Sequence, residues 1–450
     1  MTYAGTAEWL RERLWIGVPV GATAWVVWLG SIGYGCWSEN RPVDAEGTPV
    51  CVDHLTFYSA AKLVREGRSG EMYNYDLLGK YQGEQLGWDW GLLLGYRNPP
   101  FYALLYLPTT GVSFVASMVI WNAIGLGVLV LAIGWLKPER PVRTLLWSLS
   151  FYPVFAAVSF GQNSLLSLGI FAAVYRLLTI SKPGFCFGNR VSESLTRNPV
   201  SQAETGFPFL AGLVAGLLWF KPQLLIGLLI WWGLAPKKYA KCWAGVALTG
   251  AILAAISWIA LPDASWAFVD SLQSNLSYGG EKGWNKESPR AFWSLLLPNA
   301  DARVIWTLTL ASVLPAIGAA AWLAKRTGAA VAAMFPVAVF LSLWASPHTL
   351  IYEWAILIPA AIVLWERFPE RRDAWLCLFV LAWLVLAAST PLAKIQIDNL
   401  KLPGVVQLAI PAMGLIGWIV IRTLKQEFTT KAASFTKHME EVQDCGEPAT

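Results

Sequence analysis

Uncharged apolar runs recur along this chain, and they constrain its fold more than any other feature of the sequence. Runs of about 17 to 25 residues are long enough, as helices, to cross the hydrocarbon core of a bilayer. Of the 450 residues, 56% are hydrophobic and only 14% are charged. A soluble domain of this size does not have such a composition. The pattern predicts an all-α polytopic membrane protein.

Lysine and arginine gather in short loops between these runs, which accounts for the formal net charge of +5. Cytoplasmic loops of membrane proteins carry such an excess. We therefore assign to the cytoplasm the basic loops that begin at Lys137, Arg176, Lys237, Lys325 and Arg367. The charge needs no nucleic-acid partner to explain it, and none is expected. The first run, 14–34, is too long for a signal-peptide core, so we expect a retained span.

Three apolar runs between basic loops each carry a polar break near the middle. The breaks are Gly161-Gln162-Asn163, Lys221-Pro222-Gln223 and Ser346-Pro347-His348. Because a basic loop flanks each run on both sides, the chain must cross the membrane an even number of times within it. Each run is therefore predicted to be a hairpin of two short helices with its break at the outer turn. A lysine at mid-bilayer costs about 3 kcal/mol, which also favours a tip for Lys221.

The predicted topology has about twelve membrane-spanning helices. Single spans are expected at about 14–34, 112–136, 239–261, 303–324, 374–390 and 403–422. One transmembrane domain would cover 1–425, with outer loops at about 35–99 and 262–302 and a disordered polar cytoplasmic tail at 426–450. Both termini are then cytoplasmic. The expected location is the plasma (inner) membrane, with polar hairpin tips around a sunken cavity on the extracytoplasmic face.

Asp53 stands at the start of a short amphipathic helix just after the first span. Apolar residues follow at Phe57, Ala60, Ala61 and Val64, which is helical spacing. Such a helix is predicted to lie in the membrane interface of the first outer loop. The carboxylate of Asp53 is either a helix cap or an acidic group with a chemical role, and the local sequence leaves both open.

Cys36 and Cys51 are the two cysteines that this topology places outside the membrane. A bridge between them would close a loop of about 15 residues and stabilise the fold by about 3 kcal/mol on the loop-entropy model. Two free thiols are the alternative, and the sequence does not decide between them.

The ordered set of motifs resembles glycosyltransferase family 87. The set comprises Asp53-x-x-x-Phe57-Tyr58-x-Ala60-Ala61, Gly70-x-Met72-Tyr73, Tyr96-x-Asn98-Pro99-Pro100-Phe101, the three hairpin breaks, and Tyr352 after the last of them. The resemblance covers about residues 50–355. It implies a GT-C architecture and the transfer of a hexose, mannose in the characterised members, from a polyprenyl-phosphate donor. It further implies an acidic catalytic base, which maps onto Asp53, and a functional histidine, which maps onto His348.

Sugar transfer from a lipid phosphate needs a base for the acceptor hydroxyl and positive groups for the departing phosphate. A single carboxylate, Asp53, suffices if the anomeric configuration inverts. Lys221 and Arg97 are the expected ligands of the donor phosphate, together with His348. A lysine that snorkels to the headgroups and a histidine bonded only to backbone are the alternatives for Lys221 and His348.

Further polar side chains are expected to bind the substrates. They are Tyr58, Asn98, Gln162, Asn163, Gln223 and Tyr352. Helix capping is the alternative role for the amides among them.

The leading hypothesis is an integral-membrane glycosyltransferase that moves a hexose from a polyprenyl-phosphate carrier to a lipid-linked or cell-envelope glycan acceptor. No metal and no cofactor are expected, because cationic side chains can neutralise a monophosphate and no acidic pair in 262–302 has metal-ligand spacing. The sequence has no Walker A motif or Gly-rich nucleotide loop, so a nucleotide-sugar donor is not expected. The alternative is a transporter or flippase of lipid-linked sugars, which would also have many spans and a basic cavity.

Overall fold

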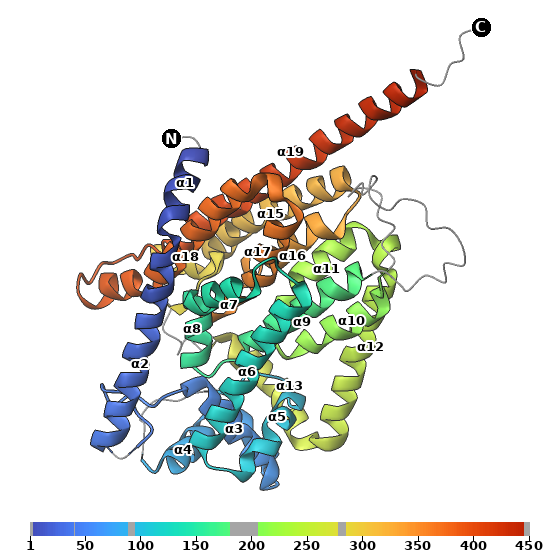
Figure 1. Cartoon of the computed structure of the whole chain (residues 1–450). Helices are drawn as coiled ribbons and strands as arrows, with labels where there is room; N and C mark the ends of the chain where they lie inside the picture. The colour runs from blue at the N-terminus through green and yellow to red at the C-terminus, as the bar shows by residue number, and fades with distance from the viewer. Residues whose placement is uncertain (1–2, 40, 89–94, 181–205, 278–284, 445–450) are drawn as a thin grey trace.

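The computed structural model describes residues 3–39, 41–88, 95–180, 206–277 and 285–444. Within these ranges the protein is a bundle of helices (Figure 1), and two isolated bridges, Val43 with Pro49 and Lys286 with Leu350, are its extended pairings. The predicted all-α class is confirmed for the described residues. The basic residues Lys182, Arg190 and Arg197 and parts of both predicted outer loops lie outside those ranges.

Four stretches of helix are long and apolar enough to cross a membrane. They are α6 (Phe114–Leu136), α12 (Pro236–Ala260), α15 (Ala302–Thr327) and the stretch Pro369–Asp398, which contains η8 (Pro369–Arg371) and α18 (Arg372–Asp398). Each of the four coincides with a predicted single span. These four apolar helices, together with the 56% hydrophobic composition, indicate a polytopic membrane protein.

Two bent helix pairs raise the number of candidate spans from four to six. The first pair is α1 (Tyr3–Arg13) and α2 (Gly17–Glu39), joined by η1 (Leu14–Ile16) and bent by 45°. The second is α7 (Pro141–Ser150) and α8 (Tyr152–Ser159), bent by 66°. By length and composition the described chain therefore has four to six spans, and the predicted number of twelve is not confirmed. The other apolar helices are too short to reach across a bilayer by themselves.

The three predicted breaks all occur between short helices. The first separates α8 from α9 (Ser164–Thr179). The second separates α10 (Pro208–Gly216) and η4 (Leu217–Phe220) from η5 (Pro222–Leu225) and α11 (Ile226–Leu234). The third separates α16 (Val331–Trp344) from η7 (Ile351–Ile356) and α17 (Leu357–Arg367). At the second break Lys221 leaves the helical region, with φ −137° and ψ 71°, because the proline after it disfavours helical backbone at this position.

Close contacts at glycines show the direction of these short helices. Gly212 faces the backbone of Cys242, and Gly216 lies against Thr249, so α10 and α12 run parallel. Since α11 joins them in sequence, it must run in the opposite direction, as a hairpin requires. Gly125 against Leu165 and Gly169 against Val128 show the same relation for α6 and α9. Small residues at these places let the helix backbones approach closely.

Contacts between loops join segments that were predicted to lie on one side. Glu139 binds Arg372, with 2.7 Å between Oε1 and Nη2, and the Lys238 ammonium lies 3.3 Å from the carbonyl oxygen of Gly328. All four residues belong to predicted cytoplasmic loops. The hairpin breaks likewise contact one another, as described below. The relative sides thus agree with the prediction, while the side that faces the cytoplasm stays a prediction.

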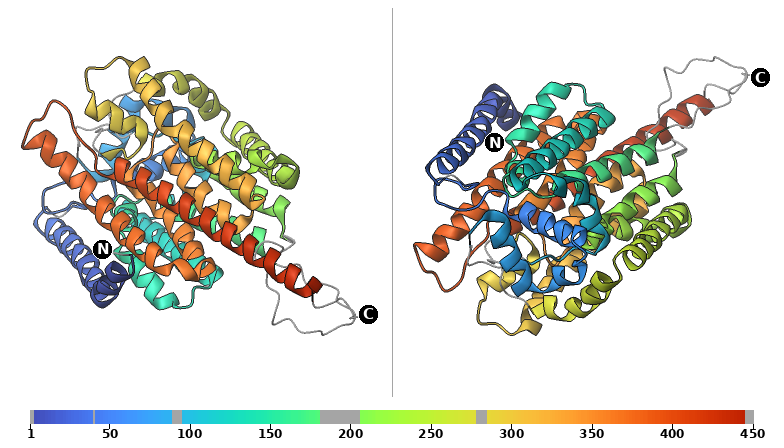
Figure 2. Two further views of the ribbon diagram at one scale, coloured as in Figure 1. Left: turned by 90° about the horizontal axis from the view of Figure 1, so that it is seen from above. Right: turned by 90° about the horizontal axis from the view of Figure 1, so that it is seen from below.

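The first predicted outer loop folds into a compact group of helices at the end of the bundle away from the N-terminus (Figures 1 and 2). The loop supplies α3 (Val52–Arg65), η2 (Ser69–Tyr73) and α4 (Tyr75–Leu86), and the group is completed by α5 (Phe101–Tyr106) and η3 (Leu107–Gly111), which follow the predicted loop. Nearby, α13 (Pro262–Ser277) and α14 (Pro289–Leu296) follow α12 and precede α15. The neighbouring elements cover α3 so fully that nine of its 14 residues are buried. A protein environment therefore replaces much of the lipid contact that was predicted for this helix.

The C-terminal tail and the cysteines differ from two of the possibilities raised by the sequence. Helix α19 runs unbroken over Ala409–Asp444 and projects from the bundle (Figure 1), so the tail is helical as far as Asp444 and not disordered there.

Cys36 and Cys51 are both free thiols. The Cys51 thiol donates to the carbonyl of Val158 on α8 at 3.5 Å. The disulfide between Cys36 and Cys51 is therefore not formed in this structure.

Candidate active site

Lys221 lies at the centre of a buried polar cluster that joins all three hairpins. Its ammonium is 3.1 Å from a carboxylate oxygen of Glu353 and 3.3 Å from Oε1 of Gln162. The same ammonium stands 5.3 Å from the centre of the Tyr352 ring, a cation–π distance. Gln162 closes the cluster by donating from Nε2 to the Tyr352 hydroxyl at 2.9 Å. We call these four residues, Gln162, Lys221, Tyr352 and Glu353, the hairpin cluster.

The ion pair in this cluster is almost entirely shielded from solvent. The side chains of Lys221 and Glu353 are 9% and 2% exposed. The second oxygen of Glu353 accepts from the backbone N–H of Leu350 at 3.2 Å. A charged lysine between apolar helices needs a partner, and Glu353 is that partner.

Glu353 is the site residue that sequence reasoning missed. The signal was present, because Glu353 is the one acidic residue in the long run from Ala329 to Trp365. Lys221 is likewise the one charged residue between Phe207 and Ala235. Lone opposite charges within apolar helical segments of one bundle tend to pair with each other.

The backbone of Asp53 contacts the turn that carries Gln162 of the hairpin cluster. The N-cap of α3 is Cys51, with φ 52° and no side-chain cap bond, so Asp53 is a residue of the first turn and not the capping residue. The N–H of Asp53 donates to the carbonyl of Phe160 at 3.1 Å. Phe160 is two residues before Gln162, and this bond therefore ties the start of α3 to the turn that carries the cluster amide.

Gly161 makes the approach of α3 to this turn possible. Its φ is +68°, which favours glycine, and a Cβ placed there would lie 2.6 Å from Cβ of His54 and 3.0 Å from Cβ of Cys51. Asp53 is half-buried and carries its charge in the positive end of the helix dipole. Burial, the neighbouring Tyr102 and then the charge of Asp53 raise the pKa of Tyr106 well above its usual value. Asp53 thus lies within electrostatic range of the α5 tyrosines.

The two asparagines of the predicted site bind protein groups that connect the loop helices. Asn98 donates from Nδ2 to the carbonyl of Phe220 at 2.9 Å, and its own carbonyl accepts from the Tyr73 hydroxyl at 2.6 Å. Asn163 donates from Nδ2 to the Tyr102 hydroxyl at 2.7 Å. Asn98 therefore joins the segment before α5 to the residue that precedes Lys221, and Asn163 joins α5 to the Gln162 turn.

His348 belongs to a segment that is anchored on the second predicted outer loop. The N–H of Glu287 donates to the carbonyl of Thr349 at 2.7 Å, and Trp354 donates from its indole to the carbonyl of Glu287 at 3.2 Å. His348 is half-buried, and its backbone N–H donates to the Ser346 hydroxyl at 3.2 Å. His348 lies in the segment between α16 and η7, four residues before Tyr352 on the hairpin that supplies Tyr352 and Glu353.

Three other predicted site residues are not drawn into the hairpin cluster by the described contacts. Tyr58 is buried and donates its hydroxyl to the carbonyl of Val112 at 2.8 Å, where η3 ends. Gln223 is half-buried on η5, just after Lys221 and Pro222, and Arg97 is half-buried just before Asn98. For these residues a role in binding substrate stays a prediction.

The remaining titratable groups near Asp53 do not offer a second base. Burial lowers the pKa of His54 to about 3, so the imidazole is neutral near pH 7, and its Nε2 lies 2.9 Å from the Ser117 hydroxyl. Within the described part of the chain, no three His, Cys, Asp or Glu side chains gather in a way that could hold a metal ion. A cavity of about 1070 Å³ elsewhere in the bundle is lined by none of the predicted site residues.

Comparison with known proteins assigns the family. Searches of the curated proteins and of the solved structures gave no match. The family model described as Glycosyltransferase family 87 matches residues 96–347, which is more than half of the chain. The match contains Lys221, Gln162 and both asparagines, while Tyr352 lies five residues after its end and Asp53 lies 43 residues before its start. The resemblance seen in the motifs is thereby confirmed, and the chain belongs to glycosyltransferase family 87.

Proposed function

We propose that this membrane glycosyltransferase moves a hexose from a polyprenyl-phosphate donor to a lipid-linked or cell-envelope glycan acceptor. The observation that carries the proposal is the meeting of three hairpin breaks at Lys221, with the first turn of α3 bound to the same Gln162 turn. Family membership supports the transfer of a sugar. Mannose is the hexose that the resemblance favours.

Asp53 is the proposed general base, acting on the acceptor hydroxyl. It is half-buried at a helix N-terminus, and such a carboxylate stays ionised more readily than one without positive dipoles nearby. A direct displacement with this one carboxylate inverts the anomeric centre. The Gln162 amide and the Tyr352 hydroxyl are proposed to bind sugar hydroxyls when the donor enters.

The charge balance of the cluster determines how the donor phosphate is bound. Because Glu353 neutralises Lys221 at 3.1 Å, this pair alone supplies no excess positive charge. We therefore assign additional contacts with the leaving phosphate to Arg97, which precedes α5, and to His348, which lies on the third hairpin. Lys221 contributes as a hydrogen-bond donor held in place by its partner. This assignment needs no metal ion.

The test uses purified protein, a panel of polyprenyl-phosphate hexoses, and the pair of variants Asp53→Asn and Asp76→Asn. Asp76 is the control because it is an exposed residue in the first turn of α4. Removal of a general base lowers turnover by about 10² to 10⁴, so Asp53→Asn should lose that much transfer while it still binds donor. Asp76→Asn should keep wild-type turnover.

Two results would contradict the proposal. Full transfer activity in Asp53→Asn would remove this carboxylate from the reaction. Absence of sugar transfer with every donor, together with movement of labelled lipid-linked sugar across reconstituted vesicles, would favour a transporter over an enzyme.

A further inference from the structure

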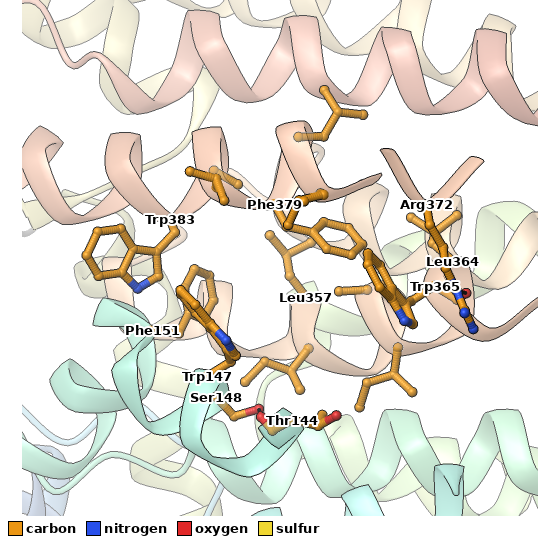
Figure 3. Close-up of a pocket in the computed structure, with 18 of the residues that line it drawn as sticks. Thr144, Trp147, Ser148, Phe151, Leu357, Leu364, Trp365, Arg372, Phe379 and Trp383 are labelled. Carbon is orange, nitrogen blue, oxygen red and sulfur yellow. Dashed lines mark hydrogen bonds between the residues drawn. The ribbon is translucent and has the colours of Figure 1, made fainter. Parts of the chain in front are cut away.

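A cavity of about 1070 Å³ lies between α1, α7, α17, α18 and α19, apart from the hairpin cluster. Figure 3 shows its walls, with Trp147 and Phe151 on one side, Phe379 and Trp383 on the other, and Arg372 at one end. None of the residues assigned above to sugar transfer lines it. The cavity is therefore separate from the site proposed above for sugar transfer.

Most of the cavity wall is hydrocarbon. Uncharged side chains from α2, α16, α17 and α19 form much of this lining, among them Val20, Phe340, Leu357, Met413 and Ile416. A site with this lining takes an apolar ligand and gains roughly 25 cal/mol for each Å² of apolar surface removed from water. Within a bilayer the available ligands of this kind are lipid chains.

The charged lining residues come from the end of α1 and from the two basic loops that begin at Lys137 and Arg367. The arginines there are Arg11, Arg13, Arg140, Arg143 and Arg372. The acidic lining residues are Glu139 and Glu366. Direct contacts hold the loops together, because Arg372 binds Glu139 at 2.7 Å and the N–H of Glu139 donates to Glu366 at 3.0 Å.

Protein carboxylates already neutralise three of these arginines. Arg11 pairs with Asp373, Arg13 with Glu12, and Arg372 with Glu139. In contrast, no side chain in the described ranges forms an ion pair or hydrogen bond with the guanidinium of Arg140 or Arg143, and both residues are exposed. They flank the N-terminus of the ten-residue helix α7, whose dipole adds to the local positive field.

We propose that this cavity binds an anionic phospholipid, with its acyl chains along the apolar walls and its phosphate at Arg140 and Arg143. Charge complementarity selects this occupant, because two arginines that form no ion pair or side-chain hydrogen bond within the described ranges stand beside a long hydrocarbon surface. Basic pockets between membrane helices bind lipid headgroups through this combination. The aromatic residues Trp147 and Trp365 lie where a belt of indoles at the headgroup level is expected.

The proposal concerns a membrane protein and does not depend on the transfer chemistry. Its test is native mass spectrometry of the detergent-purified full chain with phosphatidylglycerol or phosphatidylethanolamine added at equal concentration. The wild type should retain the anionic lipid and not the zwitterionic one. The double variant Arg140→Gln/Arg143→Gln should lose affinity for phosphatidylglycerol by about fivefold per arginine, or about 25-fold in all.

A control and a second variant make the test specific. Lys325→Gln/Arg326→Gln removes the same charge from exposed positions at the end of α15, outside the cavity lining, and should leave lipid binding unchanged. Ala361→Phe fills the cavity from α17 without altering charge, and should reduce binding by displacing an acyl chain.

Three outcomes would overturn the proposal. The first is equal retention of the two lipids by the wild type. The second is an equal loss of binding in both charge variants, which would indicate nonspecific attraction. The third is tighter retention of a polyprenyl phosphate than of phosphatidylglycerol, which would assign the cavity to the prenyl carrier instead.

Discussion

The Lys221–Glu353 pair allows a quantitative prediction, because its two charges are buried and close. At 3.1 Å and an effective dielectric constant of ~20, Coulomb's law gives an attraction of about 5 kcal/mol. Desolvation of both groups offsets much of that energy when the pair forms. Removing a single partner leaves the other charge buried without compensation, and the expected loss of stability is about 3 to 5 kcal/mol.

The experiment is a double-mutant cycle with Lys221→Met, Glu353→Gln and the two combined. Each single variant should be destabilised by the amount given above. The double variant replaces both charges by neutral groups of similar shape, so it should lose only about 0 to 2 kcal/mol relative to the wild type. The coupling energy between the two sites, which is the sum of the two single losses minus the loss in the double variant, is then at least about 4 kcal/mol.

Unfolding in detergent micelles by added SDS, followed by tryptophan fluorescence, measures these differences. The matched control is the pair Arg68 and Glu71, whose ions are 2.8 Å apart but whose side chains are 45% and 33% exposed. Solvent screens such a pair, and its cycle should show no measurable coupling. Additive effects of Lys221→Met and Glu353→Gln would refute the reasoning, because they would mean that the two charges do not stabilise each other.

Three further predictions concern single residues. Burial lowers the pKa of His54 from 6.5 to about 3, so between these pH values the unfolded chain binds a proton that the folded protein excludes. Thermal unfolding should therefore show stability falling as pH drops from 6.5 toward 3. The variant His54→Gln should remove this dependence. Burial raises the pKa of Glu287 from 4.5 to about 8. The stability contributed by its protonated carboxyl is therefore fully present below pH 4.5 and is lost as pH rises through 8. In the same thermal unfolding experiments, Glu287→Gln should be more stable than the wild type at pH 8.5. Gly161→Ala should destabilise by about 1 to 3 kcal/mol in SDS titrations, because φ is +68° and the new Cβ meets His54; a wild-type unfolding curve for this variant would refute the account of the turn.

The sequence predicted the hairpin breaks because two independent constraints coincide there. Charge parity requires a turn within each run, and the break residues include Gly161, Pro222 and Pro347, which cannot continue a regular helix at low cost. The four long single spans were also predictable, because each is a continuous apolar run of sufficient length. These are local properties, which a sequence displays directly.

Other features depend on packing, which the pattern of apolar residues does not reveal. The amphipathic pattern after Asp53 predicted the helix, but the cover that α4 and α5 form over it depends on contacts far apart in sequence. The number of spans could not be obtained from apolar runs alone, because helices such as α10 and α11 are too short to count as spans without their neighbours. The pairing of Lys221 with Glu353 joins residues 132 positions apart, and no local signal gives their distance.

The hydrogen bond from the N–H of Asp53 to the carbonyl of Phe160 has a mechanical consequence. This bond ties the start of α3, which carries the carboxylate, to the turn of the first hairpin, and Gln162 follows two residues after Phe160 on the same turn. Replacing side chains around the turn can change what each group binds, but it leaves their shared support intact. If the loop helices shift when an acceptor enters, this bond makes the backbones of Asp53 and Gln162 move together, so the spacing between them is kept.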